Sequence, residues 1–192
     1  MSEREGRSIA VFCGARPGVR DEDLLFARDF GTALARHGLG LVYGAGGAGV
    51  MGAVAAGAVA AGGGVTGVIP LHLRDRERAV EAPGATFVVR SMHERKALMY
   101  RLASGFAVLP GGIGTLDELM EVATWNQLGL IEKPVVVVNH RGFFDPMLAM
   151  LDHLVSEGFL SLKERLLLQV ADTCEEALQR LGLTEPALAG TA

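Results

Sequence analysis

The sequence contains few residues that form disulfides or bind metals. Its 192 residues include only two cysteines, Cys13 and Cys174, which lie far apart and form no C-x-x-C pair. The five histidines are scattered, and none has metal-ligand spacing with another ligand type. We therefore expect a reduced cytoplasmic protein that binds no metal.

Charge is also sparse. Only three of the 18 basic residues are lysines, which we interpret as a compositional bias of the genome. The net charge of −4 is mild and argues against nucleic-acid or membrane partners. Residues 1–8 are polar and lack the apolar core of a signal peptide. With 49% hydrophobic residues, the composition predicts one folded domain over residues 1–192, with loose tails at 1–7 and 184–192.

One long stretch, His37–Leu73, contains no Asp, Glu, Lys or Arg. A membrane span needs roughly 20 strongly apolar residues without interruption. This stretch is instead rich in Gly and Ala and is broken by Gly62–Gly64 and Pro70. We interpret it as a buried strand, turn, helix and strand.

Short apolar runs alternate with segments of helical periodicity along almost the whole chain. The expected strands are 9–13, 39–43, 65–69, 86–89, 106–109 and 134–138. The expected helices are 21–37, 50–61, 92–102, 115–127, 144–156 and 173–181, and the charged segment Arg74–Glu81 is expected at the surface. The continuous apolar strands predict an α/β fold: a doubly wound, mostly parallel, Rossmann-like sheet with helices on both faces. Such sheets bind ligands at the carboxyl ends of their strands.

The most informative motif, P-G-G-I-G-T-L-D-E at Pro110–Glu118, lies between an expected strand and an expected helix. Glycines there let backbone N–H groups approach an anion, and a helix N-terminus adds unpaired N–H groups and partial positive charge. Thr115 can add a hydroxyl donor. The motif predicts a phosphate cradle, and the alternative is a tight turn with Thr115 as the helix N-cap.

Two carboxylates follow the cradle. Glu118 lies three residues after Thr115, as in a capping box, and Glu121 lies one turn further on the same helix face. Two carboxylates near one ribose suit glycosidic chemistry. Helix capping by Glu118 and a structural or solvated role for Glu121 remain alternatives.

Two further segments can contribute to a nucleotide site. Gly44–Gly52 matches G-x-G-x-x-G between a strand and a helix. A dinucleotide site would need an acidic residue about 20 residues later, and the next acid is Asp75, so we favour a mononucleotide or ribose phosphate. In the second segment, Met92–Lys96, Arg95 can form a forked contact to phosphate or to a purine edge. Its alternative is a basic helix start on the surface.

Together these three segments resemble the Lonely guy (LOG) family, the cytokinin riboside 5′-monophosphate phosphoribohydrolases. The family patterns P-G-G-x-G-T-x-x-E and M-H-x-R-K are complete at Pro110–Glu118 and Met92–Lys96. The family's glycine-rich pattern resembles Gly44–Gly52, with Ala45 where a glycine is common. The likeness continues through Thr124-Trp125, Lys133-Pro134 and Gly142–Pro146.

The resemblance implies hydrolysis of a purine ribonucleoside 5′-monophosphate to the free base and ribose 5-phosphate, without a metal or organic cofactor. Arg95 and Glu118 would be the catalytic pair. The expected substrate-binding residues are Gly46, Gly47, Met92, Lys96, Pro110, Gly111, Gly112, Gly114, Thr115 and Glu121. The sequence departs from the family at Ala15-Arg16, where many members have two serines. Arg16 either replaces them as a phosphate or base ligand or faces solvent.

Three alternatives compete with this function. The molybdenum-cofactor carriers share the fold and hold a phosphorylated ligand without cleaving it, and a general AMP nucleosidase would have no hormone role. Members were also long labelled lysine decarboxylases, but Lys96 is the only lysine near a motif that could form a pyridoxal-phosphate Schiff base, and we reject that reaction.

The resemblance also implies a homodimer with the site near its interface. The small-residue helix 50–61 and the apolar helix around 120–128 carry more apolar surface than a thin domain can cover. We expect a dimer interface of more than about 1,000 Å² in total.

Overall fold

The computed structural model describes residues 7–74 and 84–182. The expected tails, apart from Arg7, lie outside the described residues. So does the charged segment Arg74–Glu81, apart from Arg74, which is exposed as expected.

The described strands form one parallel sheet in the order β4-β3-β2-β1-β5-β6-β7. Their bounds are β1 Ser8–Phe12, β2 Gly40–Tyr43, β3 Val65–Pro70, β4 Ala85–Val89, β5 Gly105–Val108, β6 Val135–Val138 and β7 Leu168–Ala171. Winding proceeds outward from β1 to β4 and then restarts on the other side at β5. The predicted doubly wound fold is confirmed, and its sheet is parallel throughout these strands.

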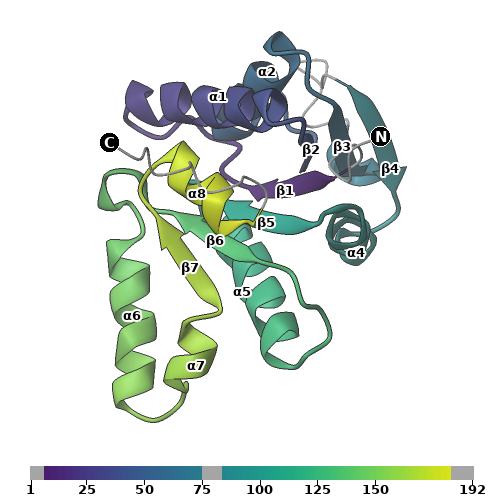
Figure 1. Cartoon of the computed structure of the whole chain (residues 1–192). Coiled ribbons are helices and arrows are strands. Elements are labelled where there is room, and N and C mark those ends of the chain that lie inside the picture. The colour runs from purple at the N-terminus through teal and green to yellow at the C-terminus, as the bar shows by residue number, and fades with distance from the viewer. Residues whose placement is uncertain (1–6, 75–83, 183–192) are drawn as a thin grey trace.

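Helices cover both faces of the sheet (Figure 1). On one face lie α1 Asp21–Arg36, α2 Gly49–Ala60 and α8 Cys174–Arg180. On the other lie α4 Met92–Leu102, α5 Ile113–Gln127 and α6 Asp145–Ser156. Short α-helices α3 Leu71–Arg74 and α7 Leu162–Arg165 and a 3-10 turn, His140–Gly142, complete the set.

Alternation along the strands builds two hydrophobic cores. In β1, Ile9 and Val11 face the α1–α2–α8 side, whereas Ala10 and Phe12 face the α4–α5–α6 side. Both sides of the central strands are buried, which explains why their sequences are continuously apolar.

The sequence-based boundaries agree with the structure within about two residues, with three exceptions. The strand β7 and the short helices α3 and α7 were not expected. The expected helix at 115–127 begins two residues earlier, at Ile113. The expected burial of every strand on both faces is wrong for β4, an edge strand where Phe87 and Val88 are nearly half exposed.

The small residues of α2 let it lie very close to α1. A Cβ added at Gly57 would overlap the carbonyl oxygen of Arg28, and one added at Gly31 would overlap the carbonyl oxygen of Val54. This face of α2 is therefore covered by α1 and is not available to a second subunit.

This contact predicts that Gly57→Ala destabilises the protein, although alanine is normally the better helix former by roughly 1 kcal/mol. The overlap with a backbone oxygen should cost about 1–3 kcal/mol of unfolding free energy. Denaturant unfolding measures the change. Gly64→Ala is the control because a Cβ there meets no atom within 4 Å, and equal stability of the two variants would contradict the close contact.

Candidate active site

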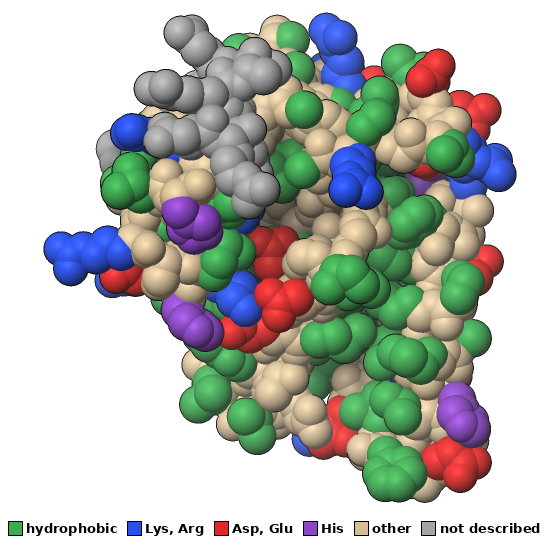
Figure 2. Space-filling model, turned by 180° about the vertical axis from the view of Figure 1, so that it is seen from behind, with side chains coloured by type: hydrophobic (Ala, Val, Ile, Leu, Met, Phe, Trp, Pro, Cys, Tyr) green, Lys and Arg blue, Asp and Glu red, His purple; other side chains and the backbone are tan. Residues whose placement is uncertain are grey.

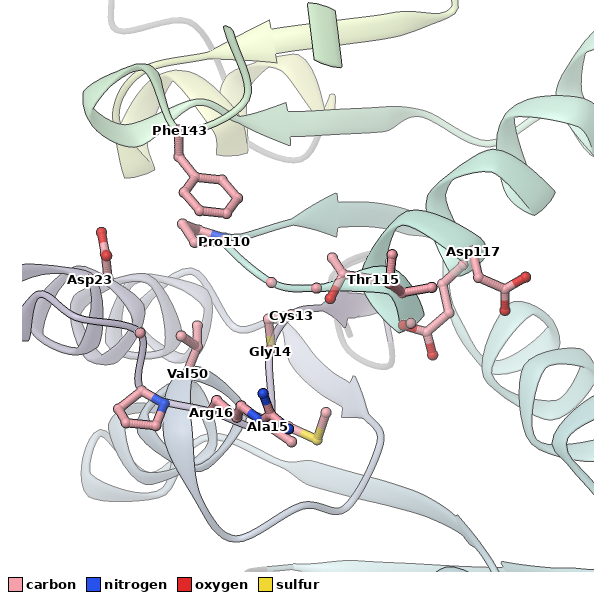
Figure 3. A pocket seen from close by; sticks show the side chains of 18 of the residues that line it. Cys13, Gly14, Ala15, Arg16, Asp23, Val50, Pro110, Thr115, Asp117 and Phe143 are labelled. Atoms are coloured by element: carbon pink, nitrogen blue, oxygen red, sulfur yellow. The ribbon is translucent and has the colours of Figure 1, made fainter. Parts of the chain in front are cut away.

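The site lies where the winding of the sheet reverses, between β1 and β5. There Gly14 N–H donates to the carbonyl oxygen of Pro110 at 3.0 Å, which joins the loops that follow the two strands. A pocket of about 610 Å³ opens over this junction (Figure 3). Its walls come from residues 13–18, the segment 110–118 and the starts of α2 and α4.

The segment Pro110–Thr115 forms one wall and presents unpaired N–H groups. Helix α5 begins at Ile113 with Gly112 as its N-cap, and no side chain caps it. Thr115 therefore lies inside the first turn, and the alternative interpretation of Thr115 as the N-cap is wrong. Among the described residues, no acceptor pairs with the N–H groups of Ile113, Gly114 or Thr115. Together with the helix dipole, these donors favour an anion.

Two of the motif's glycines are not required by the protein itself. Neither Gly112 nor Gly114 has a positive φ, and a Cβ added at either would meet no atom within 4 Å. Gly114 even lies inside a helix, where glycine costs roughly 1 kcal/mol relative to alanine. Open space over both backbones, next to free donors, is what a closely bound phosphate would fill.

Gly111 and Thr115 contact each other beneath this space. A Cβ on Gly111 would overlap the hydroxyl of Thr115, so only glycine fits there. Thr115 lines the pocket, and within the described chain its hydroxyl has no hydrogen-bond partner. The hydroxyl can therefore add a donor to the N–H groups.

Glu118 lies one turn further along α5 and also lines the pocket. Its side chain caps nothing, because the N-cap is Gly112, so the capping-box interpretation is wrong. Burial raises the pKa of Glu118 to about 7, although the positive charge of Arg95 opposes the rise. The carboxyl group is thus near its titration point at neutral pH.

Arg95 enters the pocket from α4 and is only 7% exposed, so the alternative of a basic surface segment is wrong. A Cβ at Gly44 would overlap its guanidinium, which explains the glycine directly after β2. Its Nε has no hydrogen-bond partner, and no carboxylate of a described residue lies within 4 Å of it. Its Nη1 makes only a long contact of 3.9 Å with Met92 Sδ. A buried guanidinium with an unpaired Nε donor and no carboxylate partner is well suited to bind a ligand.

Both ends of α4 are capped, which fixes the position of Arg95. The Ser91 hydroxyl accepts from Glu94 N–H at 3.2 Å at the start of the helix. At its end, Lys133 Nζ donates to the carbonyl oxygens of Tyr100 and Ala103, each at 2.7 Å. Burial lowers the pKa of Lys133.

Lys96 and Glu121 form a network beside the pocket rather than in it. Lys96 Nζ lies 3.1 Å from Asp117 Oδ2 and 2.9 Å from Glu121 Oε2, and the Tyr100 hydroxyl donates to Glu121 at 2.6 Å. Burial alone would lower the pKa of Lys96, but these hydrogen bonds raise it above its ordinary value. Lys96 and Glu121 line a shallow second hollow that shares only Asp117 and Ile113 with the main pocket.

The structure brings most of the expected site residues together, but not all of them. Arg95, Glu118, Met92, Pro110, Gly111, Gly112, Gly114 and Thr115 line one pocket. Gly46 and Gly47 do not line it, and the start of α2 is paired within the protein, since Met51 N–H donates to the Gly14 carbonyl oxygen at 3.0 Å. A role for Gly46 and Gly47 in binding stays a prediction.

Sequence reasoning missed other pocket residues. Cys13, Asp23 and Phe143 line the pocket, and no motif drew attention to Cys13 or Asp23. Phe143 lies in the Gly142–Pro146 segment of the family pattern. Burial raises the pKa of the Cys13 thiol, and the charge of Glu118 adds to the rise. Arg16 lines the pocket with an exposed side chain that makes no hydrogen bond or ion pair with the described residues.

Within residues 7–74 and 84–182, no group of three His, Cys, Asp or Glu side chains is arranged to hold a metal ion. In the same part of the chain, no helix has the length and hydrophobicity to cross a membrane.

Solved structures with this fold include molybdenum cofactor carrier proteins. The protein from Chlamydomonas reinhardtii superposes with a TM-score of 0.67 at 22% identity, covering 93% of this chain and 99% of that one. The molybdenum cofactor binding protein from Rippkaea orientalis gives a TM-score of 0.66 at 22% identity, with 93% and 96% covered. At this identity the likeness establishes the fold alone.

Sequence relatives are more similar. A family model described as "Possible lysine decarboxylase" matches residues 51–181. Cytokinin riboside 5′-monophosphate phosphoribohydrolase LOG of Oryza sativa subsp. japonica is 44% identical over 91% of this chain and 72% of its own length. LOG4 of Arabidopsis thaliana is 42% identical over 94% of this chain and 84% of its own length. With this identity over nine-tenths of its length, the chain belongs to the LOG family of cytokinin riboside 5′-monophosphate phosphoribohydrolases.

Proposed function

We propose that the protein hydrolyses the N-glycosidic bond of a purine ribonucleoside 5′-monophosphate of the cytokinin type, releasing the free base and ribose 5-phosphate. The observation that supports the proposal is that one pocket holds three features: the open glycines Gly112 and Gly114, the buried Glu118, and the buried Arg95, whose Nε has no hydrogen-bond partner. The names of the curated relatives describe the same reaction.

The 5′-phosphate would lie over Gly112 and Gly114. The N–H groups of Ile113, Gly114 and Thr115 and the Thr115 hydroxyl would donate to its oxygens. Helix α5 then places Glu118 one turn away, on the ribose side of the phosphate. Binding energy from the phosphate would thus orient the glycosidic bond toward the carboxyl group.

Glu118 would act on the ribose. As the C1′–N bond breaks, its electron pair leaves with the base, and positive charge develops on C1′ and the ring oxygen. An ionised Glu118 stabilises this charge and accepts a proton from the water that attacks C1′. The water oxygen becomes the 1-hydroxyl group of ribose 5-phosphate. The proton taken up by Glu118 passes through solvent to the departing base, which becomes the neutral free base and leaves Glu118 ionised again.

Arg95 would act on the leaving base. Its free donors can hydrogen-bond to a purine nitrogen and stabilise the negative charge that the base acquires on departure. The Lys96–Glu121–Tyr100 network would support this arrangement, because Lys96 follows Arg95 on α4 while Asp117 and Glu121 flank Glu118 on α5.

The family model's description as a possible lysine decarboxylase does not fit these side chains. A Schiff-base lysine must lose its proton to attack a carbonyl. Lys96, the only lysine near the site, is paired with Asp117 and Glu121, and its pKa is raised rather than lowered. The site's residues therefore support glycosidic hydrolysis rather than pyridoxal-phosphate chemistry.

The decisive experiment compares Glu118→Gln with the unchanged protein, using AMP, N6-isopentenyl-AMP and adenosine as substrates. Glutamine keeps the size of the side chain but cannot stabilise positive charge. We expect turnover of the monophosphates to fall on the order of a hundredfold or more, with substrate binding much less affected. Release of free base, followed by chromatography, measures the loss.

Glu157→Gln is the matched control, since Glu157 is exposed on the surface at the end of α6. It should retain full activity, and all three proteins should be folded in melting curves. An active Glu118→Gln would refute the catalytic role. No base released from any monophosphate by the unchanged protein would favour a carrier, and efficient hydrolysis of adenosine would contradict the phosphate cradle.

The raised pKa of Glu118 predicts a pH dependence. Because the ionised form is the active one, kcat/KM should rise about tenfold per pH unit below pH 7 and level off above it. The stability effect has the opposite sign. The unfolded chain releases this proton near pH 4.5 and the folded chain near pH 7. Ionisation of Glu118 therefore lowers the free energy of unfolding of the unchanged protein by at most about 3 kcal/mol as the pH rises through this range.

Glu118→Gln lacks this titration. Its stability relative to the unchanged protein should increase from pH 5 to pH 8, and denaturant unfolding at both pH values tests this without any substrate. A stability difference that does not change with pH, together with a flat kcat/KM profile, would show that Glu118 is not near its titration point.

We also propose that the protein forms a homodimer through an α5–α7 apolar face. Figure 2 shows hydrophobic side chains gathered over the half of the molecule where α5, α6 and α7 lie. We define this face by its exposed large residues: Ile113, Leu128, Leu130, Met150, Phe159, Leu162 and Leu166. Such an exposed apolar surface is typical of an interaction site.

The dimer is tested by light scattering at micromolar concentration, where we expect about twice the chain mass of 20.2 kDa. Phe159→Asp should shift the protein toward the monomer, because Phe159 is 82% exposed on this face. The control is Leu25→Asp on α1, on the opposite side of the sheet. A monomeric unchanged protein would contradict the proposal.

Finally, we propose that the chain is a single domain that acts in the cytoplasm. The described strands belong to one sheet, and both cysteines are free thiols. Free thiols are typical of reducing compartments.

A further inference from the structure

Asp23 is a buried carboxylate in the pocket that the proposed reaction does not use. It lies in the first turn of α1 and is only 9% exposed. Figure 3 shows it on the opposite side of the pocket from Thr115 and Asp117, with Pro110 between them. The pocket thus has a further acidic side chain, across Pro110 from Thr115 and Asp117.

The charge of Asp23 is only partly compensated. Arg141 approaches it loosely, with Nη2 3.8 Å from Asp23 Oδ1, and bonds closely to Glu22 instead. Two carboxylates therefore share one guanidinium, and the three side chains carry a net charge of −1. Val50 and Phe143, which also line the pocket, provide no hydrogen-bond donor.

This placement matters for the length of the ligand's phosphate chain. If the ribose lies on the Glu118 side of the cradle, the phosphate oxygens that do not bear the ribose point the other way. Any second phosphate attached there would extend toward Asp23. A buried like charge repels a phosphate strongly, because solvent screens it little.

We propose that Asp23 determines specificity by excluding ligands with more than one phosphate, so that the pocket accepts nucleoside monophosphates but not diphosphates. The inference rests on the proposed function for the orientation of the nucleotide. Arg16 is the cation that could oppose the effect. Its side chain is exposed, so its attraction for a second phosphate is weakened by water more than the repulsion by the buried Asp23.

The test is a calorimetric titration with AMP and with ADP, in a Glu118→Gln background so that neither nucleotide is consumed. We expect ADP to bind at least tenfold more weakly than AMP. Asp23→Asn, which keeps the shape of the side chain, should reduce this ratio at least fivefold. Asp21→Asn, an exposed change in the same turn that does not line the pocket, should leave it unchanged.

A second variant perturbs the same charge in the opposite direction. Arg141→Gln removes the partial compensation of the Asp23 charge and should increase the ratio of the dissociation constant for ADP to that for AMP. The turnover ratio kcat/KM for AMP over ADP, measured with Glu118 intact, should follow the same order across the variants. Melting curves identify any variant that fails to fold.

The outcomes separate this inference from the proposed function. If AMP is hydrolysed but Asp23→Asn leaves the binding ratio unchanged, or if ADP already binds as tightly as AMP, the role of Asp23 is refuted and the hydrolase proposal stands. If AMP is bound but never cleaved and the ratio still depends on Asp23, the hydrolase proposal fails and the role of Asp23 stands. Binding of neither nucleotide overturns both.

Discussion

Parallel pairing of β1 with β5 is the constraint on which the site depends. Because the chain winds outward on both sides of this pair, the crossover helices leave the junction in opposite directions and no helix of the described residues covers it. The loops after the two strands are tied together by the bond from Gly14 N–H to the Pro110 carbonyl oxygen. The pocket, with the proposed phosphate cradle and the proposed catalytic pair, lies around this point.

The electrostatics of the site depend on which charged side chains are buried and which are paired, rather than on how many there are. Lys96, Asp117, Glu121 and Tyr100 satisfy one another at the side of α5. Arg95 and Glu118 form no ion pair within 4 Å with the described residues, and burial raises the pKa of Glu118 although the charge of Arg95 opposes the rise. A structural network and the proposed catalytic pair thus alternate along the same two helices, and only the proposed pair lines the pocket together.

The sequence predicted the features that depend on local patterns. Continuous apolar runs revealed the central strands, and Pro110–Glu118 placed a glycine turn before a helix. Features that depend on contacts between distant segments could not be predicted in this way. The burial of Asp23 arises from the packing of its helix turn against other loops, and Gly44 makes room for a guanidinium from α4. Helical spacing predicted that Glu118 and Glu121 share one face of α5, but Glu118 lines the pocket whereas Glu121 pairs with Lys96 beside it. The strand β7, Leu168–Ala171, is an edge strand interrupted by a glutamine, so it lacks the continuous apolar run that revealed the central strands.

The glycines Gly112 and Gly114 have a consequence for how the sequence of this protein can evolve. Neither glycine is required by a positive φ or by its neighbours, and at Gly114, inside the first turn of α5, alanine would make the empty protein more stable. Selection for stability alone would therefore remove the features that let a phosphate approach. Their presence marks a compromise in which the helix start is kept weaker than it could be, and the missing stability is restored only when a ligand occupies the space.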